Sequence, residues 1–177
     1  MPDTGLSVED TMDDAVFDRV ATTIYEAPIG EYLGRDGAEV MARFAGKEVG
    51  LADKEYLFRE GEYAKTFYIV TSGRLALVRE GDSKRQDVII HVLEKGDLVG
   101  ELSFIDGRQH TVSCQALGEA RVLSFAVTDL TPLIDNHPRV LYDFMRAVII
   151  RVHATTAAIT RQRQELADYI ATGGKRS

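Results

Sequence analysis

The sequence predicts a mainly β protein, an antiparallel β-roll of about eight strands resembling a jelly roll, with helices before it and a long helix after it. Two observations support this prediction. Residues 47–127 consist of short β-branched and aromatic runs separated by glycine-containing turns. On either side of this region, apolar residues recur at intervals of three and four, as in helices. We therefore divide the chain into an acidic extension with helices (residues 1–45), a β-roll (46–127), and a segment with a short helix, a long helix and a polar tail (128–177).

The first 45 residues predict a frayed acidic start followed by two helices. Acidic side chains dominate the start, at Asp3, Glu9, Asp10, Asp13 and Asp14. From Val16 to Tyr25 the apolar positions follow helical spacing, until Pro28 and Gly30 interrupt them. A second helical stretch places Val40, Met41 and Phe44 on one face and ends before Gly46.

Six runs between residues 55 and 127 have the composition of strands. They are EYLF (55–58), TFYIV (66–70), RLALV (74–78), DVIIHVL (87–93), TVSCQAL (111–117) and ARVLSFAV (120–127). Within RLALV, Leu75 and Leu77 alternate with Arg74 and Ala76, which predicts a strand with one buried face. Antiparallel strands at this short spacing favour a closed roll.

The last 50 residues predict a short helix followed by a long one. Thr128 or Asp129 can cap the short helix, which runs through Ile134, and Pro138 suits the first turn of the long helix. A heptad row follows, consisting of Leu141, Met145, Val148, Val152, Thr155, Ile159, Gln162, Leu166 and Tyr169. Residues 138–168 would form a rod of about 46 Å. The first turns can pack on the roll, but the far half extends beyond it, so we expect a homodimer through this helix.

Composition limits the classes of function. The chain has 177 residues and a formal net charge of −7, which disfavours non-specific attraction to nucleic acid or anionic lipid. We expect a cytoplasmic protein with no membrane association, because the sequence shows neither a signal-peptide pattern nor an apolar stretch of roughly 20 residues. The single cysteine, Cys114, lies in an alternating apolar run and is interpreted as a buried small hydrophobe.

Catalytic and metal sites are not indicated. The four histidines, His91, His110, His137 and His153, are far apart in the sequence and form no pair at ligand spacing. No constellation of hydroxyl, histidine and acid is evident either. We therefore expect no metal and no enzymatic activity.

The stretch GDLVGELSFIDGRQHTVSC (96–114) predicts a site for an anion. Gly96 and Gly100 allow the backbone to turn tightly and to approach a ligand without a Cβ in the way. The residues after Gly100 are expected to form a one-turn helix, Glu101 to Ile105, whose free N–H groups face an anion.

The order of helices, roll and long helix, together with two motifs, resembles the cyclic nucleotide-binding domain family. The motifs are LFREGEYAKTFYIVTSGRLALV (57–78) and LEKGDLVGELSFIDGR (93–108), and the resemblance covers about residues 29–167. It implies cyclic AMP or cyclic GMP as the ligand. It also implies that Glu101 accepts a hydrogen bond from the ribose 2′-hydroxyl, and that the backbone of Gly100, Leu102 and Ser103 surrounds the cyclic phosphate. Without the resemblance, Glu101 would be a surface acid near a helix N-terminus.

The sequence departs from the family where the phosphate is held. The family continues with proline, arginine and a small or hydroxyl residue, whereas this chain has Gln109, His110 and Thr111. Arginine is always charged, but histidine with its ordinary pKa of ~6.5 is mostly neutral at neutral pH. Losing a charge-assisted bond of about 1.5–3 kcal/mol would cost one to two decades of affinity. Arg108 is an alternative cation for the phosphate, and in the family a hydroxyl at the place of Thr111 tends to accommodate guanine as well as adenine.

Two functions remain open at this point. The first is a stand-alone regulatory module of a signalling system, which binds cyclic AMP or cyclic GMP and acts on an unidentified effector protein through its last helices. The second is a degenerate relative that serves as a dimeric interaction scaffold and binds no nucleotide. A transcription factor of the catabolite-activator type would need a winged helix-turn-helix after the long helix, and Ser177 ends the sequence first, so we expect no binding to nucleic acid.

Overall fold

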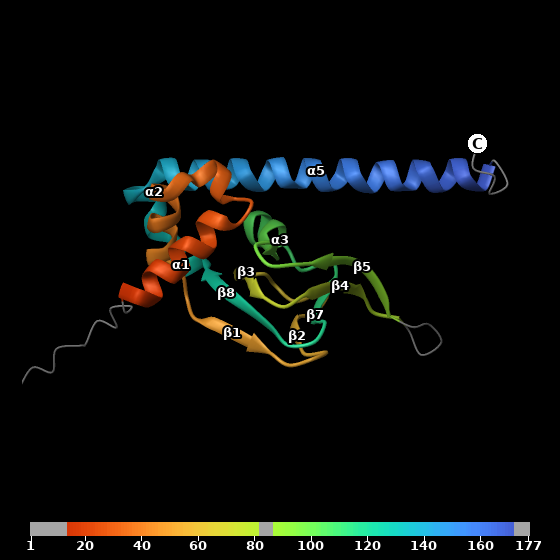
Figure 1. The fold of residues 1–177 in the computed structure, drawn as a ribbon, viewed down its shortest axis with the longest axis horizontal. Helices are drawn as coiled ribbons and strands as arrows, with labels where there is room; N and C mark the ends of the chain where they lie inside the picture. Colours follow the sequence, from red (N-terminus) through yellow and green to blue (C-terminus); the bar gives the residue numbers. More distant parts are fainter. Residues whose placement is uncertain (1–13, 82–86, 172–177) are drawn as a thin grey trace, which may run out of the picture.

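The computed structural model describes residues 14–81 and 87–171 and shows two four-stranded antiparallel sheets with helices at both ends of the chain (Figure 1). The predicted fold class is therefore confirmed. The acidic stretch before Asp14 and the tail after Ala171, for which the sequence predicts a frayed start and a polar end, lie outside the described residues.

Both N-terminal helices predicted from the sequence are present, as α1 (Asp14–Glu26) and α2 (Gly30–Arg43). The buried face of α1 includes Val20 and Ile24, which pack in the main hydrophobic core. The turn between the helices is tight, because a Cβ on Gly30 would collide with the backbone of Tyr25. The two helices form a small layer at one end of the roll (Figure 1).

The eight strands form two sheets, each with its own order. One sheet has the order β1 (Glu48–Leu51), β8 (Ala120–Ala126), β3 (Thr66–Ser72) and β6 (Leu98–Val99). The other has the order β2 (Tyr56–Phe58), β7 (Ser113–Ala116), β4 (Leu75–Arg79) and β5 (Val88–Leu93). Each of the six predicted runs contains one strand. Strands β1 and β6 were not predicted, because β1 contains Gly50 and β6 has only two residues.

The predicted one-sided burial of RLALV is wrong at Ala76. This residue is fully buried, as is its neighbour Leu75, so the strand does not alternate between core and solvent. Strand β4 lies between β7 and β5 in its sheet, so Ala76 belongs to a central strand. An alanine on a central strand is therefore a poor marker of a solvent-facing position.

Two helices follow the roll, α4 (Val127–Asn136) and α5 (Pro138–Ala171). Pro138 is the first residue of α5, as predicted. The predicted cap of α4 is wrong, because the N-cap position is Ala126, which has no side-chain capping bond. Thr128 and Asp129 lie inside the first turn instead, where the Thr128 hydroxyl donates to Asp129.

An aromatic cluster centred on Phe67 joins the roll to two helices. The Phe67 ring is stacked with Phe125 of β8 at a centroid distance of 4.9 Å and with Phe144 of α5 at 5.0 Å. It also meets Phe104 edge-on at 5.1 Å. Because Phe104 belongs to α3 (Glu101–Asp106), this Phe67 cluster connects the start of α5 with the segment predicted to hold the ligand.

The first half of α5 uses the predicted heptad row largely to pack on its own domain. Val148 is buried, and Leu141 and Val152 pack partly buried against the core, while Met145 is 41% exposed. The side chains of Thr155, Ile159, Gln162 and Leu166 lie outside the described residues. The C-terminal end of the helix extends past the roll (Figure 1).

The Phe67 cluster makes a stability prediction. We expect Phe67→Ala to lower the free energy of unfolding by about 3–5 kcal/mol, because it leaves a cavity against three other rings. Urea denaturation measures this change. Tyr63→Ala is the control, since its side chain is 68% exposed and its loss should cost only about 0.5 kcal/mol. Equal losses for the two variants would contradict the central role of the cluster.

Candidate functional site

The segment around Gly100 has the backbone that the sequence analysis expected. Gly96 and Gly100 have φ angles of +91° and +78°, in the left-handed region that favours glycine. Gly100 is the N-cap residue of α3, which begins at Glu101 and is one residue longer than predicted. The Phe104 N–H donates to the Gly100 carbonyl, which closes the first turn.

His110 packs directly against this turn. Its side chain is only 7% exposed, and its ring is stacked on Phe58 with centroids 3.7 Å apart and planes inclined by 10°. A Cβ on Gly100 would lie 3.2 Å from the His110 ring, so no larger residue fits there without displacing the imidazole. His110 is therefore a packed side chain and does not extend toward solvent as a long cationic group would.

The environment of His110 disfavours its charged form. Burial lowers the pKa of the imidazole below its ordinary value, and the nearby Glu62 carboxylate opposes this shift more weakly. Protonation of the imidazole, which would give His110 a positive charge, therefore requires a pH below its ordinary pKa. At neutral pH His110 offers an anion no charge.

The other residues predicted to bind the ligand lie in two neighbouring places, the first turn of α3 and a cavity beside His110. Glu101, Leu102 and Ser103 lie in the first turn of α3, where Leu102 is half exposed. Thr111 is exposed, and it lines a second place, a cavity of about 550 Å³ that His110 also lines. The two groups adjoin because the His110 ring contacts Gly100.

Arg108, the alternative cation, lines the same cavity but is a solvated loop residue. Its side chain is 83% exposed, and its Nε lies 3.7 Å from the Asp106 carboxylate. It is not packed against Gly100 in the way His110 is. An anion at Gly100 would therefore have to draw Arg108 away from Asp106.

Glu101 lies half-buried beside an ion pair that reaches α5. Burial raises its pKa, while its own backbone N–H and the Arg151 guanidinium lower it and Asp97 raises it further. Arg151 Nη2 donates to Asp97 Oδ1 at 2.9 Å, and both side chains are partly buried. The ion pair connects the long helix to the loop before β6.

Sequence reasoning missed this ion pair, although one signal for it exists. Arg151 lies three and four residues after Val148 and Ala147, and so continues the buried face of α5 with a charge. A cation in that position needs a carboxylate from the packed domain, and the Gly96–Asp97 turn supplies it.

A second polar group that sequence reasoning missed fixes the wall of the 550 Å³ cavity. The Ser113 side chain is fully buried, and its hydroxyl donates to Glu80 Oε1 at 2.6 Å and accepts from the Glu60 N–H at 2.9 Å. Arg59 completes the group with a 3.0 Å contact to the same Glu80 oxygen. These bonds hold Glu60, which lines the cavity, to strand β7.

Cys114 and the metal-ligating residue types are the remaining reactive side chains in the part of the chain that the structure describes. Cys114 is buried, and burial raises its pKa to about 12, which confirms its interpretation as a small hydrophobe. Within residues 14–81 and 87–171, no three His, Cys, Asp or Glu side chains are placed to hold a metal ion. None of the helices in these ranges is long and apolar enough to cross a membrane.

Comparison with known proteins agrees with this geometry. The model of the cyclic nucleotide-binding domain family matches residues 48–137, which include β1, α3 and His110. The chain therefore belongs to the cyclic nucleotide-binding domain family.

The chain resembles only part of each of two longer relatives, which have different descriptions. The chain is 27% identical over 111 residues to lysophospholipase nte1 of Neurospora crassa, covering 63% of this chain and 7% of that protein. It is 28% identical over 99 residues to a CRP-like cAMP-activated global transcriptional regulator of Mycobacterium tuberculosis, covering 56% and 44%. It thus spans less than half of either relative. The N-terminal domain of a transcriptional regulator from Streptomyces coelicolor has a similar structure, with a TM-score of 0.65, 28% identity, and coverage of 77% of this chain and 94% of that one.

The buried imidazole predicts how stability depends on pH. Because the pKa of His110 is lower in the folded chain than in the unfolded chain, its contribution to stability is present above ~6.5 and is lost as the pH falls through the folded-state pKa. His110→Phe keeps a ring against Phe58 and removes the titration. We therefore expect the parent to lose stability relative to this variant between about pH 7 and about pH 5, as measured by urea denaturation. A difference that stays constant over this range would contradict the packing of His110.

Proposed function

We propose that this protein is a regulatory module that binds a cyclic nucleotide with low affinity. The observation that carries the proposal is the backbone at Gly100, which adopts the left-handed conformation directly before Glu101 and starts α3. In the family this turn surrounds the cyclic phosphate. The Mycobacterium tuberculosis relative is described as cAMP-activated, which supports the same class of ligand.

Glu101 supports recognition of the ribose. Burial raises the pKa of this carboxyl, so its charged form is short of hydrogen-bond donors from solvent. A ribose 2′-hydroxyl would supply such a donor. We infer that Glu101 binds the ribose, with Leu102 and Ser103 contributing backbone N–H groups beside it.

The low affinity follows from His110. The imidazole is packed on Phe58 and neutral at neutral pH, so the cyclic phosphate loses the charge-assisted contact that an arginine would give. Such a contact is worth about one to two decades of affinity. Thr111 places an exposed hydroxyl at the nearby cavity and supports acceptance of cyclic GMP as well as cyclic AMP.

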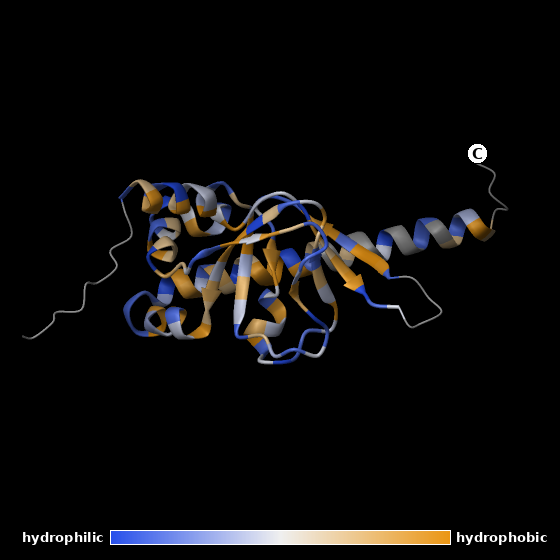
Figure 2. Ribbon diagram, turned by 90° about the horizontal axis from the view of Figure 1, so that it is seen from below, coloured by the Kyte–Doolittle hydropathy of each residue, from blue (hydrophilic) through white to orange (hydrophobic). Residues whose placement is uncertain are grey.

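We further propose a homodimer, because apolar side chains are exposed on one edge of the roll and on α5. Val88, Ile89 and Ile90 are 60%, 52% and 45% exposed on β5, an edge strand that Figure 2 shows in the apolar colour beside the grey loop of residues 82–86. Ile149 of α5 is 53% exposed. Exposed apolar edges of this kind are normally covered by a partner, and a second copy provides an equal surface.

The signal would leave the site through α5. The Arg151–Asp97 ion pair lies beside Glu101, so a ligand on Glu101 changes the electrostatic environment of the long helix. We propose that a separate effector protein reads the position of α5, that the module acts without catalysis of its own, and that it does not bind nucleic acid.

One observation favours the alternative, a dimeric scaffold that binds no nucleotide. The His110 ring lies against Gly100, where an incoming phosphate would approach. If the His110 ring stays in place when a nucleotide approaches, the phosphate cannot reach Gly100, and the protein keeps its fold but binds no nucleotide. Calorimetric titration with cyclic AMP and with cyclic GMP distinguishes the two functions.

The substitution His110→Arg tests the missing charge. We expect it to strengthen cyclic nucleotide binding by about tenfold or more, the value of one charge-assisted contact. Isothermal titration calorimetry of the parent and the variant measures the change. Adding Glu101→Ala to the arginine variant should weaken binding again, because the ribose acceptor is lost.

Arg108→Ala is the matched control for that experiment. We expect it to leave binding by the parent unchanged, because the Arg108 side chain is 83% exposed and faces Asp106. If it abolishes binding, Arg108 and not His110 occupies the phosphate position. No binding to either the parent or the arginine variant would contradict the proposed function and favour the scaffold.

Ile149→Glu tests the dimer. A glutamate on each copy would place like charges at the proposed interface, so we expect monomers in sedimentation velocity where the parent forms dimers. Val49→Glu, at a 36% exposed residue of β1, is the control and should remain dimeric. A parent protein that is monomeric at high concentration would contradict the proposal.

A further inference from the structure

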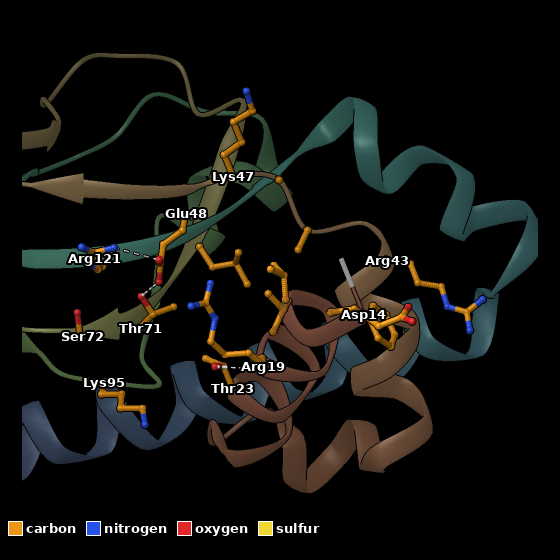
Figure 3. A pocket seen from close by; sticks show the side chains of 16 residues that line it. Asp14, Arg19, Thr23, Arg43, Lys47, Glu48, Thr71, Ser72, Lys95 and Arg121 are labelled. Atoms are coloured by element: carbon orange, nitrogen blue, oxygen red, sulfur yellow. Dashed lines mark hydrogen bonds and ion pairs between the residues drawn. The ribbon is translucent and has the colours of Figure 1, made fainter. Parts of the chain in front are cut away.

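A large cleft lies on the side of the domain formed by α1, the connection from α2 to β1, and the β1–β8–β3 part of the first sheet (Figure 3). Its volume is about 1420 Å³. None of its lining residues also lines the cavity beside His110. The cleft is therefore separate from the candidate nucleotide site, and the proposed function does not use it.

The cleft is basic in a chain that is acidic as a whole. Its cationic residues are Arg19, Arg43, Lys47, Lys95 and Arg121, and its carboxylates are Asp14 and Glu48. All five cationic residues are exposed. A local excess of three positive charges contrasts with the formal net charge of −7, so the cleft attracts anions that the rest of the surface repels.

Part of this positive charge has no partner among the described residues. Glu48 is occupied, because it receives a hydrogen bond from Thr71 at 2.8 Å and an ion pair from Arg121 at 3.4 Å. Arg19 and Lys47 have no carboxylate within ion-pair distance in residues 14–81 and 87–171. Figure 3 shows the Arg19 side chain directed from α1 across the cleft toward the strands that carry Thr71 and Glu48.

Apolar side chains from α1 and the sheet also line the cleft. They are Val16, Phe17, Val20 and Leu123. A ligand that fits both features carries negative charges for the cations and apolar groups for these side chains. The volume exceeds the roughly 300–1,000 Å³ typical of small-molecule sites, which favours an extended ligand.

We propose that this cleft binds an acidic peptide segment of a partner protein, with carboxylates at Arg19 and Lys47 and an apolar side chain against Phe17. The concave shape suits a single peptide chain better than a flat lipid surface. The net charge of −7 disfavours a nucleic acid, whose long polyanionic backbone would extend beyond the cleft. The inference does not depend on the cyclic nucleotide site.

Fluorescence anisotropy with a labelled peptide of alternating glutamate and leucine tests the proposal. We expect saturable binding that weakens as salt rises, and no binding of the same peptide with glutamine in place of glutamate. The double variant Arg19→Glu/Lys47→Glu should bind the peptide at least about tenfold more weakly than the parent, because two attractive contacts become repulsive. Arg79→Glu, on the exposed end of β4 outside the cleft, should bind like the parent.

Urea denaturation of each variant separates a loss of binding from a loss of folding, and Arg19→Ala replaces the double variant if the latter does not fold. Equal binding by the parent and the double variant would overturn the proposal, as would binding of the glutamine peptide.

The titration is repeated on the chain without residues 1–13, whose acidic side chains, Asp3, Glu9, Asp10 and Asp13, are potential competitors. Binding that occurs only in the shortened chain would overturn the assignment to a partner protein and favour this segment as the ligand.

Discussion

The stacking of Phe67 on Phe125 and Phe144 is the interaction on which the arrangement of the domain depends. Phe67 and Phe125 come from paired strands, and Phe144 brings the start of α5 onto them. Phe104 attaches α3 to the same rings. The same rings therefore hold both α3 and the start of α5, and the Arg151–Asp97 ion pair separately connects α5 to the turn before β6. A compact aromatic contact thus links the candidate nucleotide site at α3 to the long helix α5.

The fold could be predicted from local patterns because its strands and helices carry them. Glycines at the turns, β-branched runs and the change to helical spacing after Val127 identified six of eight strands and all four longer helices. The rest depends on tertiary contacts. Ala76 is buried on a central strand, and α4 follows β8 directly with Ala126 at its N-cap position. Neither fact is visible in the local sequence.

The candidate site divides in the same way. The turn at Gly100 was predictable, because Gly96 and Gly100 flank the apolar pair Leu98 and Val99, and glycine readily adopts the left-handed conformation that tight turns need. The state of His110 was not predictable, because it depends on Phe58, which lies about fifty residues earlier in the chain and stacks on the imidazole. Burial in this contact, and not the ordinary pKa of histidine, determines the charge that a phosphate would meet. The basic cleft was also hidden, because its cations come from separate segments.

The burial of Cys114 makes the chain convenient for spectroscopy. It is the single cysteine of the sequence, and with a pKa of about 12 and no exposed surface it will not react with maleimide or disulfide-forming labels in the folded state. A cysteine introduced on the outer half of α5 would therefore be labelled selectively without removing the native one. Spin or fluorescent probes attached there would measure the spacing of the two copies in the proposed dimer, with and without ligand, in an otherwise unmodified protein.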